Sequence, residues 1–390
     1  MRVALISMPG EGASTVRLAG HSIAWHQVQA ALALACERVV CLADRPGPEL
    51  ALVQREAERR GVSFHGTGSH RALSGLVKAA DTLIVFAPGI LPDREWLAQA
   101  FGGRVGVAVL SSEGAVERGF ERIDRERAWA GVLATRGDAV EALGALPPDA
   151  DPIAGLLRVS LQRGASGIAV PDKWLDEDRW ALVGSPAAAE RYEVHWYQRH
   201  APPPPPHVPG AALAHRFARW LAGRVGDARR ARIALAASGV AAGIAGATAG
   251  FLGQTTAAMT GLTAASLLLA IAAALGRLSR AGTGEPARDR WEEQRRAFLD
   301  LSLVAVATSP RTFEGWTTAF AALVLVAAIR LAAEPSSPLF LRPMSDRTLM
   351  LALLTIAAAG ELFAPAMALL ALLALALRIF WPHQKKLTPA

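Results

Sequence analysis

The stretch APPPPPHVPG, residues 201–210, separates two halves of the chain that suit different solvents. Consecutive prolines favour an extended, semi-rigid conformation, so we expect a linker here. Before it, short apolar runs alternate with polar segments, whereas after it the sequence is almost continuous Ala, Leu, Val and Ile. With 390 residues, 52% of them hydrophobic, and a mean hydropathy of +0.26, the chain has room for two domains and favours the membrane class.

Residues 1–200 have the pattern of an α/β domain. Apolar runs that fit strands occur at 3–7, 38–42, 82–87 and 105–110, and helical patterns occur at 22–35 and 48–60. Strands that alternate with helices predict a mostly parallel sheet with helices on both faces. In such sheets ligands bind at the carboxyl ends of the strands. The first residues lack the apolar core and cleavage site of a signal peptide, so we expect this domain in the cytoplasm.

The second half has the pattern of a membrane domain. Residues 211–232 place Leu213, Phe217 and Trp220 at helical spacing among arginines, which predicts an amphipathic helix in the headgroup layer. Residues 233–382 are expected to form an all-α bundle of six transmembrane helices. The apolar segments run at 233–253, 256–275, 297–309, 316–333, 348–362 and 364–381.

The distribution of positive charge predicts the orientation of this bundle. Arginines precede the first span and fill the loop at 277–296, and lysines occupy a basic tail at 383–390. Basic residues in short loops mark the cytoplasmic side, so we expect a multi-pass protein of the inner (cytoplasmic) membrane with both termini in the cytoplasm. The net charge of +7 is thereby explained without nucleic acid as a partner.

The turn that follows the first predicted strand is rich in glycine. It reads PGEGASTVR, residues 9–17, and its backbone N–H groups can surround a phosphate. The turn and the residues after it resemble the sugar-phosphate and molybdopterin nucleotidyltransferases. This resemblance implies a nucleotide site at Gly10, Gly12, Ser14 and Arg17. Such enzymes hold a metal with a carboxylate after a later strand, where this chain has Ala87 or Pro88, with Asp93 further on.

The membrane half resembles the CDP-alcohol phosphatidyltransferases. Their motif begins Asp-x-x-Asp-Gly-x-x-Ala-Arg, ends Gly-x-x-x-Asp-x-x-x-Asp, and binds two metal ions. In this chain Ala272 and Leu275 stand where the first two aspartates belong. Gly276 and Arg280 keep the glycine and the final arginine of the first half, and the spacing of the second half falls on Asp289, Glu293 and Ala297. Asp300 is reached only in a shifted register. The candidate remnant of the CDP-alcohol site therefore consists of Gly276, Arg280, Glu293 and Asp300. The remaining carboxylates are too few to hold two divalent ions, so we assign no catalytic residue and no metal ligand.

The order of the two resemblances is that of bifunctional proteins in which an inositol-phosphate cytidylyltransferase precedes a di-inositol-phosphate-phosphate synthase. Because the expected metal ligands are missing from both halves, we expect a catalytically degenerate member of this type. It would support phospholipid-headgroup or polyol-phosphate synthesis. The resemblance implies the lipid bilayer, CDP, CTP or a CDP-alcohol, and a second copy or an active homologue as partners.

Two alternatives stay open. The first is an active CDP-alcohol or polyol phosphotransferase that binds Mg or Mn through displaced carboxylates at Asp93, Glu292, Glu293 and Asp300. The second is a lipid-handling or transport scaffold. A transport path needs polar groups between the helices, and the apolar segments contain few ionisable residues to line it.

Overall fold

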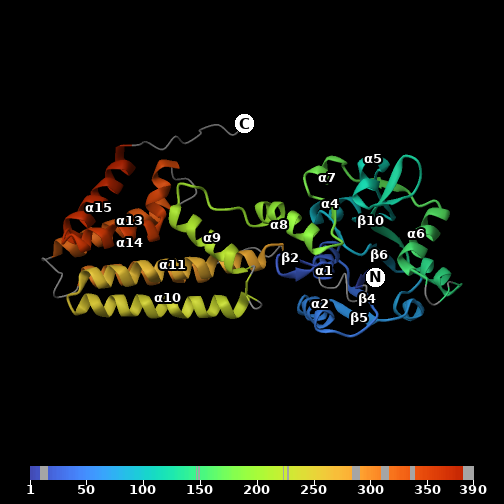
Figure 1. Ribbon diagram of the computed structural model, residues 1–390, viewed down its shortest axis with the longest axis horizontal. Coiled ribbons are helices and arrows are strands. Elements are labelled where there is room, and N and C mark those ends of the chain that lie inside the picture. Colours follow the sequence, from blue (N-terminus) through green and yellow to red (C-terminus); the bar gives the residue numbers. More distant parts are fainter. Residues whose placement is uncertain are drawn as a thin grey trace. The chain divides into compact units, whose positions relative to one another are not determined.

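The computed structural model of the 390-residue chain is shown in Figure 1. It describes residues 1–8, 16–145, 147, 150–222, 224–225, 228–282, 290–308, 316–333 and 339–380. The chain divides into two compact units, Met1–His200 and Ala201–Ala390, and each is described by itself.

The first unit is an α/β domain, as predicted. Its large sheet has the strand order β11-β8-β10-β6-β1-β4-β5, with β9 paired to β10. The strands are β1 (Arg2–Met8), β4 (Arg38–Ala43), β5 (Ser63–Thr67), β6 (Thr82–Phe86), β8 (Gly106–Ser111), β9 (Glu121–Arg122), β10 (Arg127–Arg136) and β11 (Gly167–Ala169). Most neighbours are parallel, but β10 runs antiparallel to β6, β8 and β9. The prediction of a mostly parallel sheet is therefore confirmed, with β10 as the reversed strand.

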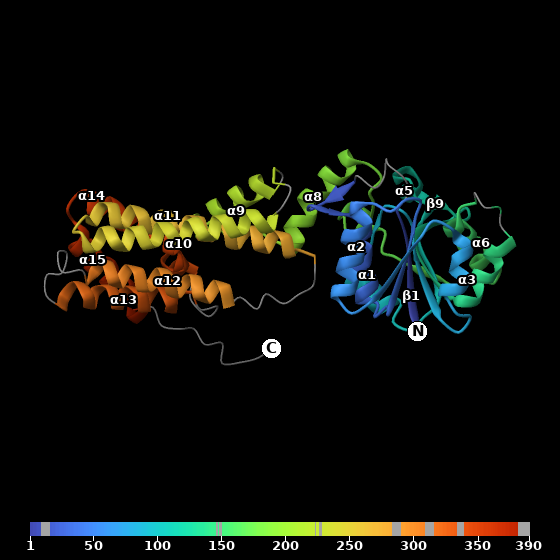
Figure 2. The same ribbon diagram turned by 90° about the horizontal axis from the view of Figure 1, so that it is seen from below.

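Helices cover both faces of this sheet (Figure 2), with α1 and α2 on one side and α3 and α6 on the other. Side chains fix several of their starts, since Ser22, Asp93 and Asp151 accept hydrogen bonds from the first turns of α1, α4 and α6. The helices are α1 (Ile23–Ala33), α2 (Pro48–Arg59), α3 (Leu73–Leu76), α4 (Arg94–Ala100), α5 (Ser112–Ala115), α6 (Pro152–Gln162), α7 (Lys173–Asp176) and α8 (Pro186–His200). Short strand pairs join β2 (Arg17–Leu18) to β3 (His21–Ser22) and β7 (Ile90–Leu91) to β12 (Ala181–Leu182).

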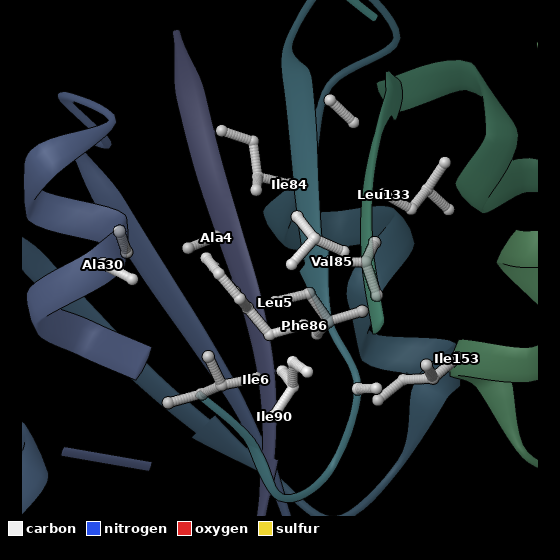
Figure 3. Close-up of a cluster of buried hydrophobic side chains, with 14 of the residues drawn as sticks. Ala4, Leu5, Ile6, Ala30, Ile84, Val85, Phe86, Ile90, Leu133 and Ile153 are labelled. Carbon is white, nitrogen blue, oxygen red and sulfur yellow. The ribbon is translucent and has the colours of Figure 1, made fainter. Parts of the chain in front are cut away.

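The core of this unit lies on both sides of the central strands. Leu5 and Ile6 of β1 and Ile84 and Phe86 of β6 are fully buried and lie among the side chains shown in Figure 3. Strands covered on both faces need apolar side chains in both directions. This explains why β1 and β6 were visible in the sequence as unbroken apolar runs rather than as alternating patterns.

The described part of the second unit is helical. Its helices are α9 (Pro209–Ala222), α10 (Ala228–Phe251), α11 (Thr255–Arg280), α12 (Arg290–Ala307), α13 (Trp316–Ala332), α14 (Arg347–Ala359) and α15 (Phe363–Phe380), with a 3-10 helix η4 (Leu339–Ser345) before α14. Each predicted apolar segment coincides with one of α10 to α15. Among the described residues, α10 and α11 have the length and composition that a membrane crossing requires.

The bundle of six spans remains a prediction. Helix α14 has 13 residues and rises only about 20 Å, compared with the ~30 Å of a hydrocarbon core. Helix α12 begins with a charged turn that holds Glu292 and Glu293. These two helices therefore depend on neighbouring helices or flanking residues if they cross a bilayer.

Helices α10 and α11 lie side by side (Figures 1 and 2), and glycines of both helices line their contact. A Cβ atom added to Gly246 would lie 2.8 Å from the carbonyl oxygen of Ala258, and one added to Gly261 would lie 2.8 Å from the Cα of Gly246. The two backbones thus touch where both residues lack a side chain.

We expect Gly246→Val to destabilise this pair of helices by about 1–3 kcal/mol, because the new side chain overlaps a backbone that cannot move alone. Thermal unfolding of the detergent-purified protein, followed by circular dichroism, should show a lower midpoint. Ala245→Val is the matched control, since Ala245 is exposed on the same helix. Equal midpoints for the two variants would contradict the close approach.

Candidate functional site

The first candidate site lies where the order of the parallel strands reverses. Strand β1 pairs with β4 on one side and with β6 on the other, which is the switch point at which open α/β sheets bind ligands. A cavity of about 90 Å³ opens here. Its walls include Ser7 and Met8 at the end of β1, Ser22 before α1, Gln27 within α1, and Pro88 and Gly89 after β6. The hydroxyl oxygen of Ser7 is buried and has no hydrogen-bond partner among the described residues.

The predicted nucleotide residues are only partly placed. Gly10, Gly12 and Ser14 lie outside the described residues. Arg17, in β2, forms an ion pair with Glu49 in the first turn of α2, with 2.8 Å between Nη2 and Oε2. Its charge is therefore already neutralised in part by a carboxylate.

The turn after β6, residues 87–89, contains no carboxylate. The side-chain amide of Gln27 donates to the carbonyl oxygens of Ala87 and Ile90, at 2.8 and 3.2 Å. Gly89 has φ +77°, and an added Cβ would lie 2.9 Å from the carbonyl oxygen of Val183. The turn is thus stabilised by the Gln27 amide, which binds its carbonyl groups, and by Gly89, which allows a positive φ and the close approach of Val183.

Asp93 has two structural partners. It caps α4 by accepting from the backbone N–H of Trp96 at 3.0 Å, and it accepts from Nε and Nη2 of Arg179 at 3.0 and 2.7 Å. The guanidinium of Arg179 also lies over the ring of Trp174, 4.1 Å from its centroid. The carboxylate is therefore held by a fixed cation and by a helix terminus.

A larger open cavity of about 570 Å³ adjoins the first one, because Val183 and Gly184 line both. Arg118, Arg191 and Tyr192 contribute polar groups to its wall. Burial raises the pKa of Tyr192 to about 12, so its hydroxyl keeps its proton at neutral pH. Sequence analysis did not single out these residues, because no motif marks them.

The second candidate site is a pocket of about 210 Å³ in the helical unit, lined by residues of α9, α11, α12, η4 and α14. We call it the arginine pocket. Four arginines and two acidic residues line it: Arg277, Arg295, Arg296, Arg347, Glu292 and Asp346. Several of them are paired, since Glu292 accepts from Arg295 and, at 3.1 Å, from Nε of Arg296.

Arg347 of this pocket also belongs to an ion cluster with Asp300 and Arg330. Asp300 of α12 accepts two hydrogen bonds from Arg347 of α14, at 2.8 and 3.0 Å, and one from Nε of Arg330 of α13 at 2.8 Å. The side chains of Asp300 and Arg347 are only 6% and 8% exposed. One carboxylate thus joins three helices.

Asp346, the residue before Arg347, also links two helices. Its Oδ1 accepts from the backbone N–H of Leu349 at 3.2 Å and caps α14, while its Oδ2 accepts from the backbone N–H of Gly210 in α9. A Cβ atom added to Gly210 would lie 2.5 Å from Oδ1 of Asp346. The start of α9 can therefore reach the cap of α14 only because residue 210 is a glycine.

The predicted remnant of the CDP-alcohol site is dispersed over this region. Gly276 is buried beneath the side chain of Arg232, and Asp300 belongs to the ion cluster. Glu293 is exposed on α12, and Arg280 is the last residue of α11. Neither is among the described residues that line the pocket. The arginines that do line it were interpreted from the sequence only as markers of membrane orientation.

No protein-family model and no curated protein matches the chain. Among solved structures, the chain is similar to the inositol-1-phosphate CTP transferase from T. maritima. The match has 13% sequence identity and a TM-score of 0.38, and it covers 50% of this chain and 95% of that one.

His26 is a buried titratable group near the first candidate site. It lies on α1, with its Nε2 3.0 Å from the carbonyl oxygen of Leu18, and its ring meets Trp25 and Trp196 edge-on. Burial lowers its pKa from 6.5 to about 3, against the opposing effect of the bond to Leu18. The folded domain therefore holds a neutral imidazole.

We expect the first unit to lose stability as the pH falls from about 6.5 toward 3. The unfolded chain binds a proton at His26 in this range and the folded chain does not, so the free energy of unfolding drops by up to about 1.4 kcal/mol per pH unit. Above that range the contribution is fully present. Urea unfolding followed by tryptophan fluorescence measures it.

The control for this pH dependence is His26→Gln, whose amide can still donate to Leu18 but does not titrate. It should flatten the slope between pH 6.5 and 5. His200, whose pKa is also lowered by burial, contributes to the slope that remains. An unchanged slope in His26→Gln would assign the effect to other groups.

We expect Asp300→Asn to destabilise the helical unit by about 3–5 kcal/mol, because it leaves the buried guanidinium of Arg347 without its carboxylate. The unfolding midpoint in detergent should fall sharply. Glu293→Gln is the matched control and should leave the midpoint unchanged, since Glu293 is exposed. In Asp300→Asn/Arg347→Gln part of the loss should return. A normal midpoint for Asp300→Asn would show that the carboxylate is not needed for folding.

Proposed function

We propose that the chain is a membrane-attached protein of the nucleotidyltransferase plus CDP-alcohol phosphatidyltransferase type that binds a phosphorylated ligand without metal-dependent transfer. It supports phospholipid-headgroup or polyol-phosphate synthesis, alone as a homodimer or with an active homologue. The observation that carries this proposal is the engagement of Asp300 by Arg330 and Arg347 beside an arginine-lined pocket.

The carboxylates that an active enzyme would need have other partners. Asp93 is bound by Arg179, Glu292 by Arg295 and Arg296, and Asp300 by Arg330 and Arg347. Among the residues that the structure describes, no three His, Cys, Asp or Glu side chains come together as a metal site. A divalent ion at any of these acids would have to displace a guanidinium. The described residues therefore do not fit the two-metal arrangement of the transferases.

The arginine pocket has the charge of a phosphate site. Its four arginines face two carboxylates, and Asp300, which binds Arg347, is balanced by Arg330. These eight described residues carry an excess of two positive charges. Guanidinium groups bind phosphate oxygens through paired N–H donors, and these bonds strengthen where water is partly excluded. The excess charge favours a doubly charged phosphate over a neutral polyol.

The α/β unit supplies the nucleotide part of the proposal. Strand β1 ends at the switch point of the sheet, where the buried hydroxyl of Ser7 has no partner among the described residues. The glycine-rich sequence, residues 9–15, follows β1 in the chain and lies outside the described residues. CDP, CTP or a CDP-alcohol is the ligand class that we assign to this turn. Binding there, like binding in the arginine pocket, depends on backbone and guanidinium donors.

Calorimetry on the detergent-purified full chain tests the proposal. Inorganic phosphate, CDP, CTP and a CDP-alcohol are titrated with and without magnesium or manganese. We expect phosphate binding that does not depend on the metal. Arg296→Gln should weaken it about tenfold, equivalent to roughly 1.4 kcal/mol, whereas Arg290→Gln, at an exposed arginine on the same helix, should not. Metal-dependent release of CMP would overturn the proposal in favour of the active transferase.

A further inference from the structure

The helical unit contains a second pocket, which is apolar, unlike the charged arginine pocket. It has a volume of about 150 Å³, lies between α13, η4 and α15, and its described wall is apolar. We call it the apolar pocket. The side chains that define it are Val324, Ala328, Leu331, Met344, Ala374 and Leu375. Small residues on α13 and α15 leave a space that larger side chains would fill.

The apolar pocket and the arginine pocket are lined by neighbouring residues of the same two segments. Ala332, the last residue of α13, lines the apolar pocket, and Ala333 after it lines the arginine pocket. In η4, Met344 lines the apolar pocket and Ser345 lines the arginine pocket. The two cavities therefore adjoin the end of α13 and the end of η4.

From the end of α13, the apolar pocket extends back along this helix. Its lining runs from Ala332 back to Val324, a rise of about 12 Å at 1.5 Å per residue. The arginine pocket alone, at about 210 Å³, is smaller than the roughly 300 Å³ or more of common small-molecule sites. A compact charged group fits one cavity, and an extended apolar chain fits the other.

We propose that the two pockets form one binding site for a phospholipid with a phosphomonoester headgroup. The phosphate lies in the arginine pocket, and an acyl chain lies between α13 and α15. A phosphomonoester carries nearly two negative charges at neutral pH, which matches the excess of two positive charges. This inference rests on the proposed function, since it names the ligand class of the same arginine pocket.

The surface around the pockets favours a lipid over a soluble phosphate. On α13, Phe320 and Leu323 are each 56% exposed, and on α15 Leu369 and Leu372 are 66% and 64% exposed. Such helices suit an apolar solvent. A water-soluble polyol phosphate would use only the arginines and would leave the adjoining apolar cavity without an occupant.

Titration of the full chain in detergent, followed by native mass spectrometry, tests the site with three probes: dioleoyl phosphatidic acid, dioleoyl phosphatidylcholine and glycerol 3-phosphate. We expect phosphatidic acid to bind at least tenfold more tightly than either of the others. Phosphatidylcholine lacks the second negative charge, and glycerol 3-phosphate lacks the chains.

Two variants separate the contributions of the pockets. Ala328→Phe fills the apolar pocket and should weaken phosphatidic acid binding at least tenfold while glycerol 3-phosphate binding is unchanged. Arg296→Gln should weaken both ligands. Leu372→Phe, on the exposed face of α15, is the control and should change neither. If Ala328→Phe does not fold, Ala374→Leu places a smaller obstruction in the same pocket.

The outcomes distinguish this inference from the proposed function. Normal phosphatidic acid binding by a folded pocket-filling variant, or equal affinities for phosphatidic acid and glycerol 3-phosphate, would overturn the lipid site and leave phosphate binding intact. Binding of none of the phosphate probes would overturn both.

Discussion

The ion cluster of Asp300 with Arg330 and Arg347 determines the shape of the helical unit. Removing charged groups from water is costly, and a buried carboxylate is tolerated only where its lone pairs are filled by good donors. Asp300 accepts three hydrogen bonds from residues of two other helices. The positions of α12, α13 and α14 are therefore linked through one side chain. Two of these helices, α12 and α14, line the arginine pocket together with α9, α11 and η4.

The same cluster explains why a carboxylate at a motif position does not imply the chemistry of the motif. A metal-binding aspartate needs an open side and further oxygen ligands around it. Asp300 instead faces two guanidinium groups, so its negative charge is already compensated. Asp300 therefore has a structural function. The excess positive charge lies on the arginines that line the pocket, where an anion can bind.

The sequence predicted β1, β4, β6 and β8 of the α/β unit, because strands covered on both faces are apolar throughout. It did not predict β5, β10 or β11. The direction of β10 depends on the connections of the chain, which an apolar run does not reveal. In the helical unit the segments were predicted, but the partners of Asp300 were not. Arg330 and Arg347 lie 30 and 47 residues away along the chain, and only the packing of the helices brings them together. The pocket arginines carry no motif, so the sequence indicated only their relation to the membrane surface.

The contact between Asp346 and Gly210 has a consequence for how this chain can diverge. A side chain at position 210 would overlap the carboxylate of Asp346 and also Thr348, whose Cβ lies 2.6 Å from an added Cβ. Replacing Asp346 first would remove the acceptor of the Gly210 N–H and the cap of α14 together. Neither position can change alone at low cost, so in related sequences the two should be retained as a pair or exchanged as a pair.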